Sequence, residues 1–161
     1  MDTFLLKALP LAAAAHVFEE FVFPGGFRAW YARYRPETAV SFTTTFAVGI
    51  NALFLVVCSL PLLSVPSPQA IALWLTLAAV VFGNAVFHAR GTLKMREYSP
   101  GVVTGVLLYM PLAVVGFLHF VQVGEASLGT AIVAALLGGS YSLFTVINHR
   151  RRARRVARPE G

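Results

Sequence analysis

The sequence predicts an all-α protein, a polytopic membrane helical bundle of about five transmembrane helices, and three observations support this fold class. First, 57% of the 161 residues are apolar and only 12% are charged, about half the charged share of an ordinary soluble domain. Second, no Asp, Glu, Lys or Arg occurs between Thr38 and Ala89, and only Glu125 occurs between Ser99 and Asn148. Third, these uncharged runs exceed the roughly 20 apolar residues that a bilayer-spanning helix needs.

Five segments are long and apolar enough to span a bilayer, and each must be helical because lipid offers no partners to unpaired backbone groups. Short stretches rich in proline and glycine separate them. Pro10 and Pro111 lie inside segments and are expected to kink them. We treat residues 1–149 as one transmembrane domain and residues 150–161 as a basic cytoplasmic tail. The segments cover residues 4–23, 39–63, 69–89, 101–122 and 127–147.

The first segment has a second interpretation as a cleaved signal peptide, because residues 4–15 are apolar and end in a run of small residues. However, Asp2 is the only charge before Lys7, and apolar character resumes after His16 through Phe23. We therefore expect a membrane segment that stays in the protein.

Basic residues set the expected orientation. All of them except Lys7 fall in the first loop, the third loop or the C-terminal tail. The positive-inside rule makes that side cytoplasmic, so the N-terminus is expected outside and the C-terminus inside. The arginine tail and a pI near 10.1 also suggest nucleic-acid binding. A stop-transfer anchor that touches anionic lipid headgroups explains the arginines without a nucleic-acid partner, and we favour it.

Polar residues recur where a bilayer should exclude them. At about 100° per residue, Glu19 and Glu20 flank His16 within one wedge of the first segment. Asn84 and His88 are four residues apart and share one face of the third segment. Both segments run toward the predicted cytoplasmic side, so these five side chains share one leaflet. Ionisable residues inside a membrane usually face the bundle interior and mark functional sites.

Two explanations compete for this cluster: a hydrogen-bonded polar core that fixes helix register, and a functional site. A charge at mid-bilayer costs roughly 2.5–3.5 kcal/mol, whereas an interhelical hydrogen bond recovers only about 0.6 kcal/mol. A structural zinc ion contributes on the order of 10 kcal/mol. Hydrogen bonds alone therefore recover less free energy than two buried charges cost, and this difference favours metal binding or catalysis over a purely structural core.

A metal site would use a predictable set of ligands. His16 and His88 with Glu19 or Glu20 form a two-histidine, one-carboxylate set that suits one divalent metal ion, zinc or iron. The other glutamate would then be a general base or a hydrogen-bond partner of a ligating histidine. The predicted catalytic residues are His16, Glu19, Glu20, His88 and Asn84. The predicted further substrate contacts are Asn51, Tyr98 and Trp30.

At these residues the sequence resembles the bacterial integral membrane proteins named for their HXXEE motif. The motif reads His16-Val17-Phe18-Glu19-Glu20, and the elements Asn84-Ala85-Val86-Phe87-His88 and Tyr98-Ser99-Pro100-Gly101 follow in order. The resemblance covers about residues 5–147. It implies a multi-pass protein of the bacterial inner membrane, and it implies no substrate because the function of the family is undefined.

The function expected from these observations is a membrane-embedded enzyme that acts on a lipophilic small molecule from the cytoplasmic leaflet. Its chemistry would be metal-assisted or acid–base, as in an isomerase, cyclase, hydrolase or oxidase. The alternatives are a proton-coupled small-molecule carrier and a non-catalytic membrane partner subunit. The Gly101-x-x-x-Gly105 pair allows close helix packing within the chain or between chains, so the oligomeric state stays open.

Overall fold

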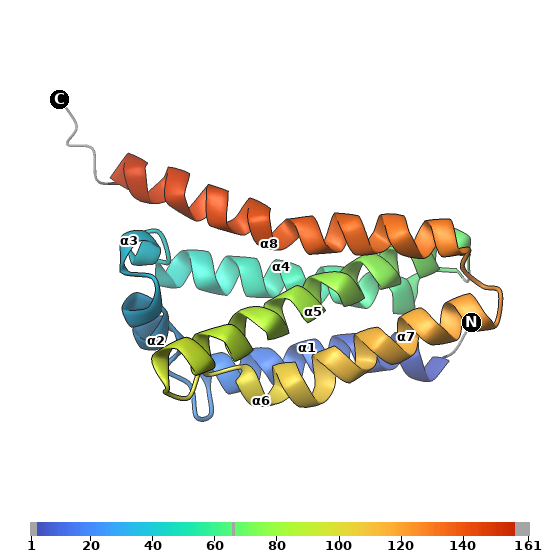
Figure 1. Cartoon of the computed structure of the whole chain (residues 1–161), viewed down its shortest axis with the longest axis horizontal. Coiled ribbons are helices and arrows are strands. Elements are labelled where there is room, and N and C mark those ends of the chain that lie inside the picture. The colour runs from blue at the N-terminus through green and yellow to red at the C-terminus, as the bar shows by residue number, and fades with distance from the viewer. Residues whose placement is uncertain (1–2, 66, 157–161) are drawn as a thin grey trace.

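The computed structural model describes residues 3–65 and 67–156, which fold into helices joined by short loops (Figure 1). In chain order the elements are α1 (Thr3–Phe21), α2 (Phe27–Tyr34), α3 (Pro36–Ala39), α4 (Thr44–Leu63), α5 (Pro68–Met95), α6 (Val102–Thr104), the π-helical turn η1 (Gly105–Tyr109), α7 (Met110–Gln122) and α8 (Leu128–Val156).

Among the described residues, four helices are long and apolar enough to cross a membrane: α4, α5, the continuous run from α6 to α7, and α8. The predicted all-helical membrane fold is confirmed. The fifth predicted segment is also a helix, α1, but Lys7, Glu19 and Glu20 place three charged residues within its 19 residues. Both glutamates are buried. α1 is therefore the helix that carries charged groups into the bundle.

Three helix boundaries differ from the predicted segments. Pro36 begins α3, and the Thr43 hydroxyl accepts the Phe46 N–H at 3.2 Å, so the second segment begins at Thr44 instead of residue 39. α5 continues to Met95 instead of ending at residue 89. α8 continues to Val156, so much of the predicted tail is helical, while Arg158 of that tail lies outside the described residues.

The loops alternate between the two ends of the bundle (Figure 1). The start of α1, the α4–α5 loop and the α7–α8 loop lie at one end, and α2, α3, the α5–α6 loop and the end of α8 lie at the other. The basic loops of the sequence therefore share one end with the arginines of α8. This arrangement matches the charge asymmetry from which we predict orientation.

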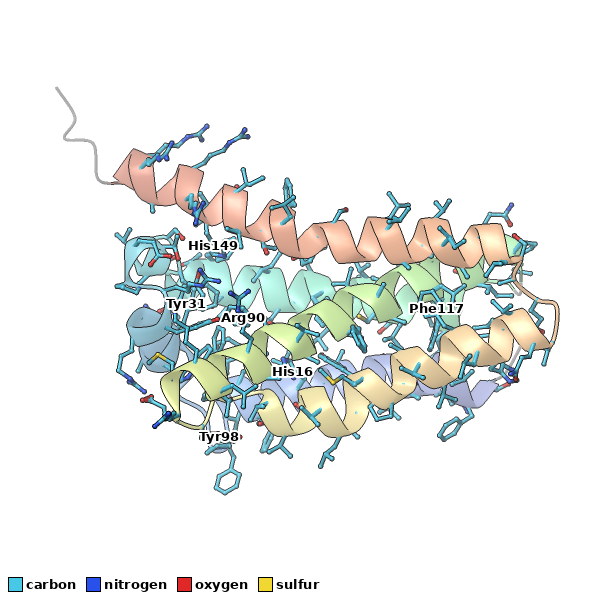
Figure 2. All side chains as sticks on the ribbon, viewed as in Figure 1. His16, Tyr31, Arg90, Tyr98, Phe117 and His149 are labelled. Atoms are coloured by element: carbon cyan, nitrogen blue, oxygen red, sulfur yellow. The ribbon has the colours of Figure 1, made fainter. Side chains whose placement is uncertain are left out.

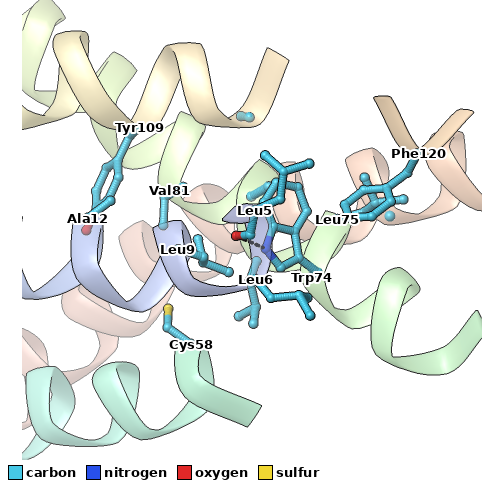
Figure 3. Packing of buried hydrophobic residues seen from close by; sticks show 14 of the residues in the cluster. Leu5, Leu6, Leu9, Ala12, Cys58, Trp74, Leu75, Val81, Tyr109 and Phe120 are labelled. Atoms are coloured by element: carbon cyan, nitrogen blue, oxygen red, sulfur yellow. Dashed lines mark hydrogen bonds between the residues drawn. The ribbon is translucent and has the colours of Figure 1, made fainter. Parts of the chain in front are cut away.

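α5 is the central helix and packs along α8 on one side and along η1 and α7 on another. Close approach depends on small residues, because a Cβ at Gly116 would overlap the Trp74 ring and one at Gly138 would overlap the α5 backbone at Thr76. Trp74 donates its indole N–H to the Leu5 carbonyl at 3.0 Å, which joins α5 to α1 inside the apolar core (Figure 3). This core fills the half of the bundle away from α2.

The turn that precedes Pro111 is π-helical. Proline has no N–H to offer the carbonyl one turn earlier, and a π turn is a known response of a helix to such an interruption. A Cβ on Gly105, the first residue of this turn, would lie 3.2 Å from the Ala85 Cα on α5. Close packing at Gly105 therefore occurs within the chain.

The first loop contains α2 and α3, which cover one end of the bundle. Four aromatic residues of α2 are buried and form a second apolar cluster with Phe21, Phe42, Phe87 and Met95: these are Phe27, Trp30, Tyr31 and Tyr34. The cluster places aromatic rings directly over His88.

Candidate functional site

Three predicted residues meet inside the bundle. His16 and Glu20 lie one turn apart on α1, and His88 faces them from α5; their exposed fractions are 1%, 6% and 0%. Glu20 Oε1 lies 3.1 Å from His88 Nε2 and 3.5 Å from His16 Nε2. One potential ligand atom from each residue lies within 4.8 Å of the others. We call His16, Glu20 and His88 the His–Glu–His cluster.

A hydroxyl group holds the far side of each imidazole. His16 Nδ1 lies 2.8 Å from Thr104 Oγ1, and His88 Nδ1 lies 2.9 Å from Ser99 Oγ. The Asn84 side-chain amide donates to His16 Nε2 at 3.3 Å, which requires the His16 proton to be on Nδ1. Hydroxyl partners at Nδ1 leave both Nε2 atoms directed toward Glu20. Histidines that bind metals commonly have such a partner on the other ring nitrogen.

His88 Nε2 is the buried atom that most needs an explanation. It lies within 3.1 Å of Glu20 Oε1, but the geometry makes no hydrogen bond, so the nitrogen has no hydrogen-bond partner among the described residues. A buried polar atom without a partner costs about 1–3 kcal/mol. With the His88 proton on Nδ1, toward Ser99, the Nε2 lone pair faces the carboxylate oxygen, and this arrangement favours a cation between them.

Gly101 brings the loop after α5 against this cluster. Its φ of +99° is in the left-handed region, which favours glycine. A Cβ here would lie 2.8 Å from Cε1 of both His16 and His88 and 3.1 Å from Glu20 Cγ. The Tyr98-Ser99-Pro100-Gly101 element is therefore part of the site, and the absence of a side chain at Gly101 leaves room for both imidazoles.

Glu19 serves a different purpose from Glu20. Its Oε1 accepts hydrogen bonds from the Tyr98 hydroxyl at 2.5 Å, the Gly101 N–H at 2.9 Å and the Val103 N–H at 3.0 Å, and its Oε2 accepts the Thr104 N–H at 2.7 Å. A carboxylate so placed satisfies the unpaired N–H groups that begin a helix and complements its dipole. Glu19 thus holds the start of α6 in place. Its oxygens are occupied by these donors, so Glu20 is the carboxylate that remains as a candidate metal ligand.

Tyr98 and Trp30 lie outside the cavity in which we expect substrate. Tyr98 is 44% exposed at the edge of its loop (Figure 2). Desolvation and its hydrogen bond to Glu19 hold the pKa of Tyr98 well above its usual range, so it stays a proton donor to that carboxylate. Trp30 is buried and its ring stacks 6.0 Å from the His88 ring. Tyr98 and Trp30 therefore contact Glu19 and His88 on the sides of these residues that face away from the cavity.

A cavity of about 580 Å³ gives access to the cluster, a size typical of small-molecule sites. Its walls come from α4, α5 and α8 and the α2–α3 region, and most of its lining is apolar. His16, Glu20 and Asn84 reach it, whereas His88 lies behind them. Asn51 also lines it, with its amide N–H₂ donating to the Ala47 carbonyl at 2.8 Å. The carbonyl oxygen of Asn51 and its second N–H are therefore left to contact a ligand.

Sequence reasoning did not single out four residues that shape this site. Thr104 and Ser99 hold the two imidazoles, and Gly101 leaves room for them. The Tyr109 ring lies 4.5 Å from the His16 ring, and its buried hydroxyl is unpartnered among the described residues. Ser99 and Gly101 were visible as parts of the Y-S-P-G element. Thr104 and Tyr109 carried no signal, because their role depends on how the loop folds back over α1.

The fold and the site together define a helical membrane protein with a buried cluster of two histidines and one carboxylate. The chain belongs to the family described as "Protein of unknown function with HXXEE motif", whose profile matches residues 7–116. The matched region contains the His–Glu–His cluster, Asn84 and the Y-S-P-G element, and it ends before α8. No curated protein and no solved structure matched the chain.

Replacing Ser99 tests whether the hydroxyl partners tune the cluster. In Ser99→Ala the His88 Nδ1 loses its partner, so the ring orientation and the proton position are no longer fixed. We expect about 10- to 100-fold weaker zinc binding, the usual cost of such a change, measured by competition with a chromogenic chelator. Ser59→Ala removes a hydroxyl that, among the described residues, bonds to the Leu55 carbonyl within α4, and it should leave affinity unchanged. Equal affinities for both variants would contradict this role of Ser99.

Proposed function

We propose that this protein is a membrane-embedded, metal-dependent enzyme that acts on a lipophilic small molecule. The proposal depends mainly on the convergence of His16 Nε2, His88 Nε2 and Glu20 Oε1 at one buried point. Zinc and iron ligands lie about 2.0–2.2 Å from the ion, which puts neighbouring ligand atoms about 3–3.5 Å apart. Both separations to Glu20 Oε1, 3.1 and 3.5 Å, agree with one such ion, and all three ligand atoms lie within 4.8 Å of one another.

The donor set also suggests which ion. Two neutral imidazoles and one carboxylate suit zinc or non-haem iron and leave coordination positions open. A bound ion of this kind polarises a substrate oxygen or lowers the pKa of a bound water. Asn84 lines the cavity and lies 3.3 Å from His16 Nε2. When His16 Nε2 gives its lone pair to the ion, the Asn84 amide loses that acceptor and can donate to a substrate instead. Isomerisation, cyclisation, hydrolysis and oxidation are all reactions that such a site supports.

An enzyme fits better than a proton-coupled carrier. A carrier needs a polar path to both ends of the bundle, whereas the half beyond the cluster is filled by apolar residues such as Leu9, Trp74 and Phe120, each 0% exposed. A partner subunit held together by polar residues would not need a cavity of about 580 Å³ beside them. The cavity on one side of a buried polar cluster therefore favours catalysis.

Catalysis without a metal is the second candidate, because Glu20 lies between two imidazoles. Such a group can move protons at a substrate held against Asn84. Substitution of Glu20 would then abolish turnover although no metal was lost.

Elemental analysis of the purified protein separates these two candidates. We expect about one zinc or iron ion per chain in the wild type and almost none in His16→Ala, His88→Ala and Glu20→Gln, because each variant removes one of three ligands. Asn84→Ala, which removes no predicted ligand, is the control and should keep its ion. If the wild type contains no stoichiometric metal after expression with added zinc or iron, the metal proposal is wrong and the acid–base candidate replaces it.

The membrane context completes the proposal. We place the protein in the bacterial inner membrane with the α2–α3 end cytoplasmic, since that end carries the basic loops. The arginines at the end of α8 would then contact anionic lipid headgroups, and the cavity would lie in the cytoplasmic leaflet.

A further inference from the structure

The lining of the cavity changes from apolar to cationic along its length. Its deep end is formed by Phe54, Val80 and Tyr141, the lining residues of α4, α5 and α8 that lie farthest from the α2–α3 end. Its other end is lined by three arginines that come from different elements: Arg35, Arg90 and Arg150. Glu37 is the acidic residue that lines this end.

Two of these arginines have no counter-charge of their own. Arg35 lies 3.8 Å from Glu37 and over the Tyr34 ring. By contrast, the side chains of Arg90 and Arg150 are exposed and make no hydrogen bond or ion pair with any described residue. Arg90 points from α5 into the space beside Tyr31 (Figure 2), and both residues line the cavity. Unpaired guanidinium groups of this kind recognise carboxylate or phosphate oxygens.

Arg90 lines the same cavity as Asn84, from a position nearer the end of α5. The α5 residues that line the cavity are Val80, Gly83, Asn84, Val86, Phe87 and Arg90, which extend over about three turns of the helix. Arg90 is six residues beyond Asn84, which corresponds to about 9 Å along the helix axis. A ligand bound to Arg90 would therefore extend past Asn84 before it reached the apolar end.

The side of the cavity between α4 and α8 is lined by apolar residues, as a site for a lipid chain requires. Its walls include Phe46, Ile50 and Phe54 of α4 and Phe144 of α8. Within the described residues, α4 and α8 each pack against α5 but are not a closely packed pair. The cavity between them is therefore placed to receive a chain from the surrounding bilayer.

We propose that the cavity binds a single-chain amphiphile with an anionic head group, with the head at Arg90 and Arg150 and the chain extending past Asn84 toward Phe54. This inference deepens the proposed function and depends on it only for the reaction: the bond that reacts would lie roughly 9 Å from the head group, beside Asn84. A neutral lipophile would leave both guanidinium groups with water as their only partner.

Binding of [³H]palmitate to the full chain in a neutral detergent tests this assignment. We expect saturable binding to the wild type and about tenfold or greater weakening in Arg90→Gln and in Arg150→Gln, because a charge-assisted pair is lost in each. Arg33→Gln is the matched control, since Arg33 pairs with Glu97 outside the cavity and its loss should leave affinity unchanged. Unchanged affinity in both Arg90→Gln and Arg150→Gln would overturn the proposal.

Competition identifies the source of the anion. Hexadecyl phosphate should displace palmitate, whereas hexadecanol, which has the chain without the charge, and inorganic phosphate, which has the charge without the chain, should not. Displacement by hexadecanol would show that the arginines do not recognise the ligand, and displacement by inorganic phosphate would show a site for free anions. Either result would refute the proposal that the cavity binds an anionic amphiphile.

Metal analysis of the same samples keeps this test separate from the proposed function. His88→Ala should lose its metal and still bind palmitate, because His88 does not line the cavity. Arg90→Gln should keep its metal and lose palmitate binding. If the wild type contains no metal but binds palmitate, and this binding is weakened in Arg90→Gln, only the metal proposal is wrong. If the wild type contains metal and Arg90→Gln leaves palmitate affinity unchanged, the amphiphile proposal is wrong and the metal proposal stands.

Discussion

Glu19→Ala is expected to destabilise the protein by about 3–5 kcal/mol, because four donors lose their acceptor at once. The carboxylate accepts the Tyr98 hydroxyl and the backbone N–H groups of Gly101, Val103 and Thr104. Hydrogen bonds to a charged group contribute about 1.5–3 kcal/mol each, and they do not add fully because the donors share one acceptor. For a chain of this size the Tm should fall by roughly 10 °C or more, measured by thermal unfolding in detergent.

A matched acidic residue provides the control for this prediction. Glu97 lies near the same loop and pairs with Arg33 at the surface, where both side chains are more than one third exposed. Exposed ion pairs contribute only about 0–1 kcal/mol, so Glu97→Ala should change Tm little. Equal Tm values for Glu19→Ala and Glu97→Ala would show that the hydrogen bonds of Glu19 at the start of α6 do not stabilise the loop.

Gly101→Ala is expected both to destabilise the fold and to disrupt the His–Glu–His cluster. The new Cβ would lie 2.8 Å from Cε1 of each imidazole, closer than carbon atoms pack. Because His16, His88 and the loop all belong to closely packed elements, the rings must move apart, and overpacking of this kind costs about 1–3 kcal/mol. Metal content should fall with the loss of ligand geometry, measured by elemental analysis beside the Tm.

Gly124→Ala separates the backbone effect from the packing effect. Gly124 has a φ of +73°, and a Cβ there would meet no atom within 4 Å. Both substitutions therefore place alanine in the left-handed region, but only the one at Gly101 meets the cluster. Gly124→Ala should lower Tm modestly and leave metal content unchanged. If both variants keep their metal, Gly101 does not set the positions of the two imidazoles.

Part of the candidate site could be predicted from the sequence because it follows from helix periodicity. His16 and Glu20 are one turn apart, and Asn84 and His88 are one turn apart, so each pair must share a face of its helix. Segregated charges placed both pairs at the same end of the bundle. These local rules brought together the residues that make up the cluster.

The sequence could not separate the roles of Glu19 and Glu20. Both fall within the same wedge of α1, and either could ligate a metal by composition alone. The difference arises because the chain after α5 folds back and presents the N–H groups of Gly101, Val103 and Thr104 to Glu19. Backbone donors leave no trace in amino-acid composition, so this role appears only when the loop is placed in space.

By itself, the sequence determined that this protein is an all-helical membrane bundle of the HXXEE family, because bilayer-length apolar runs and helix periodicity are local properties of the chain. Tertiary structure alone decided which carboxylate faces both imidazoles, which hydroxyls orient them and which arginines reach the cavity. These features depend on contacts between residues as much as 88 positions apart, as in the bond from His16 to Thr104. Side chains so far apart in the chain become neighbours only through helix packing, and no local pattern records it.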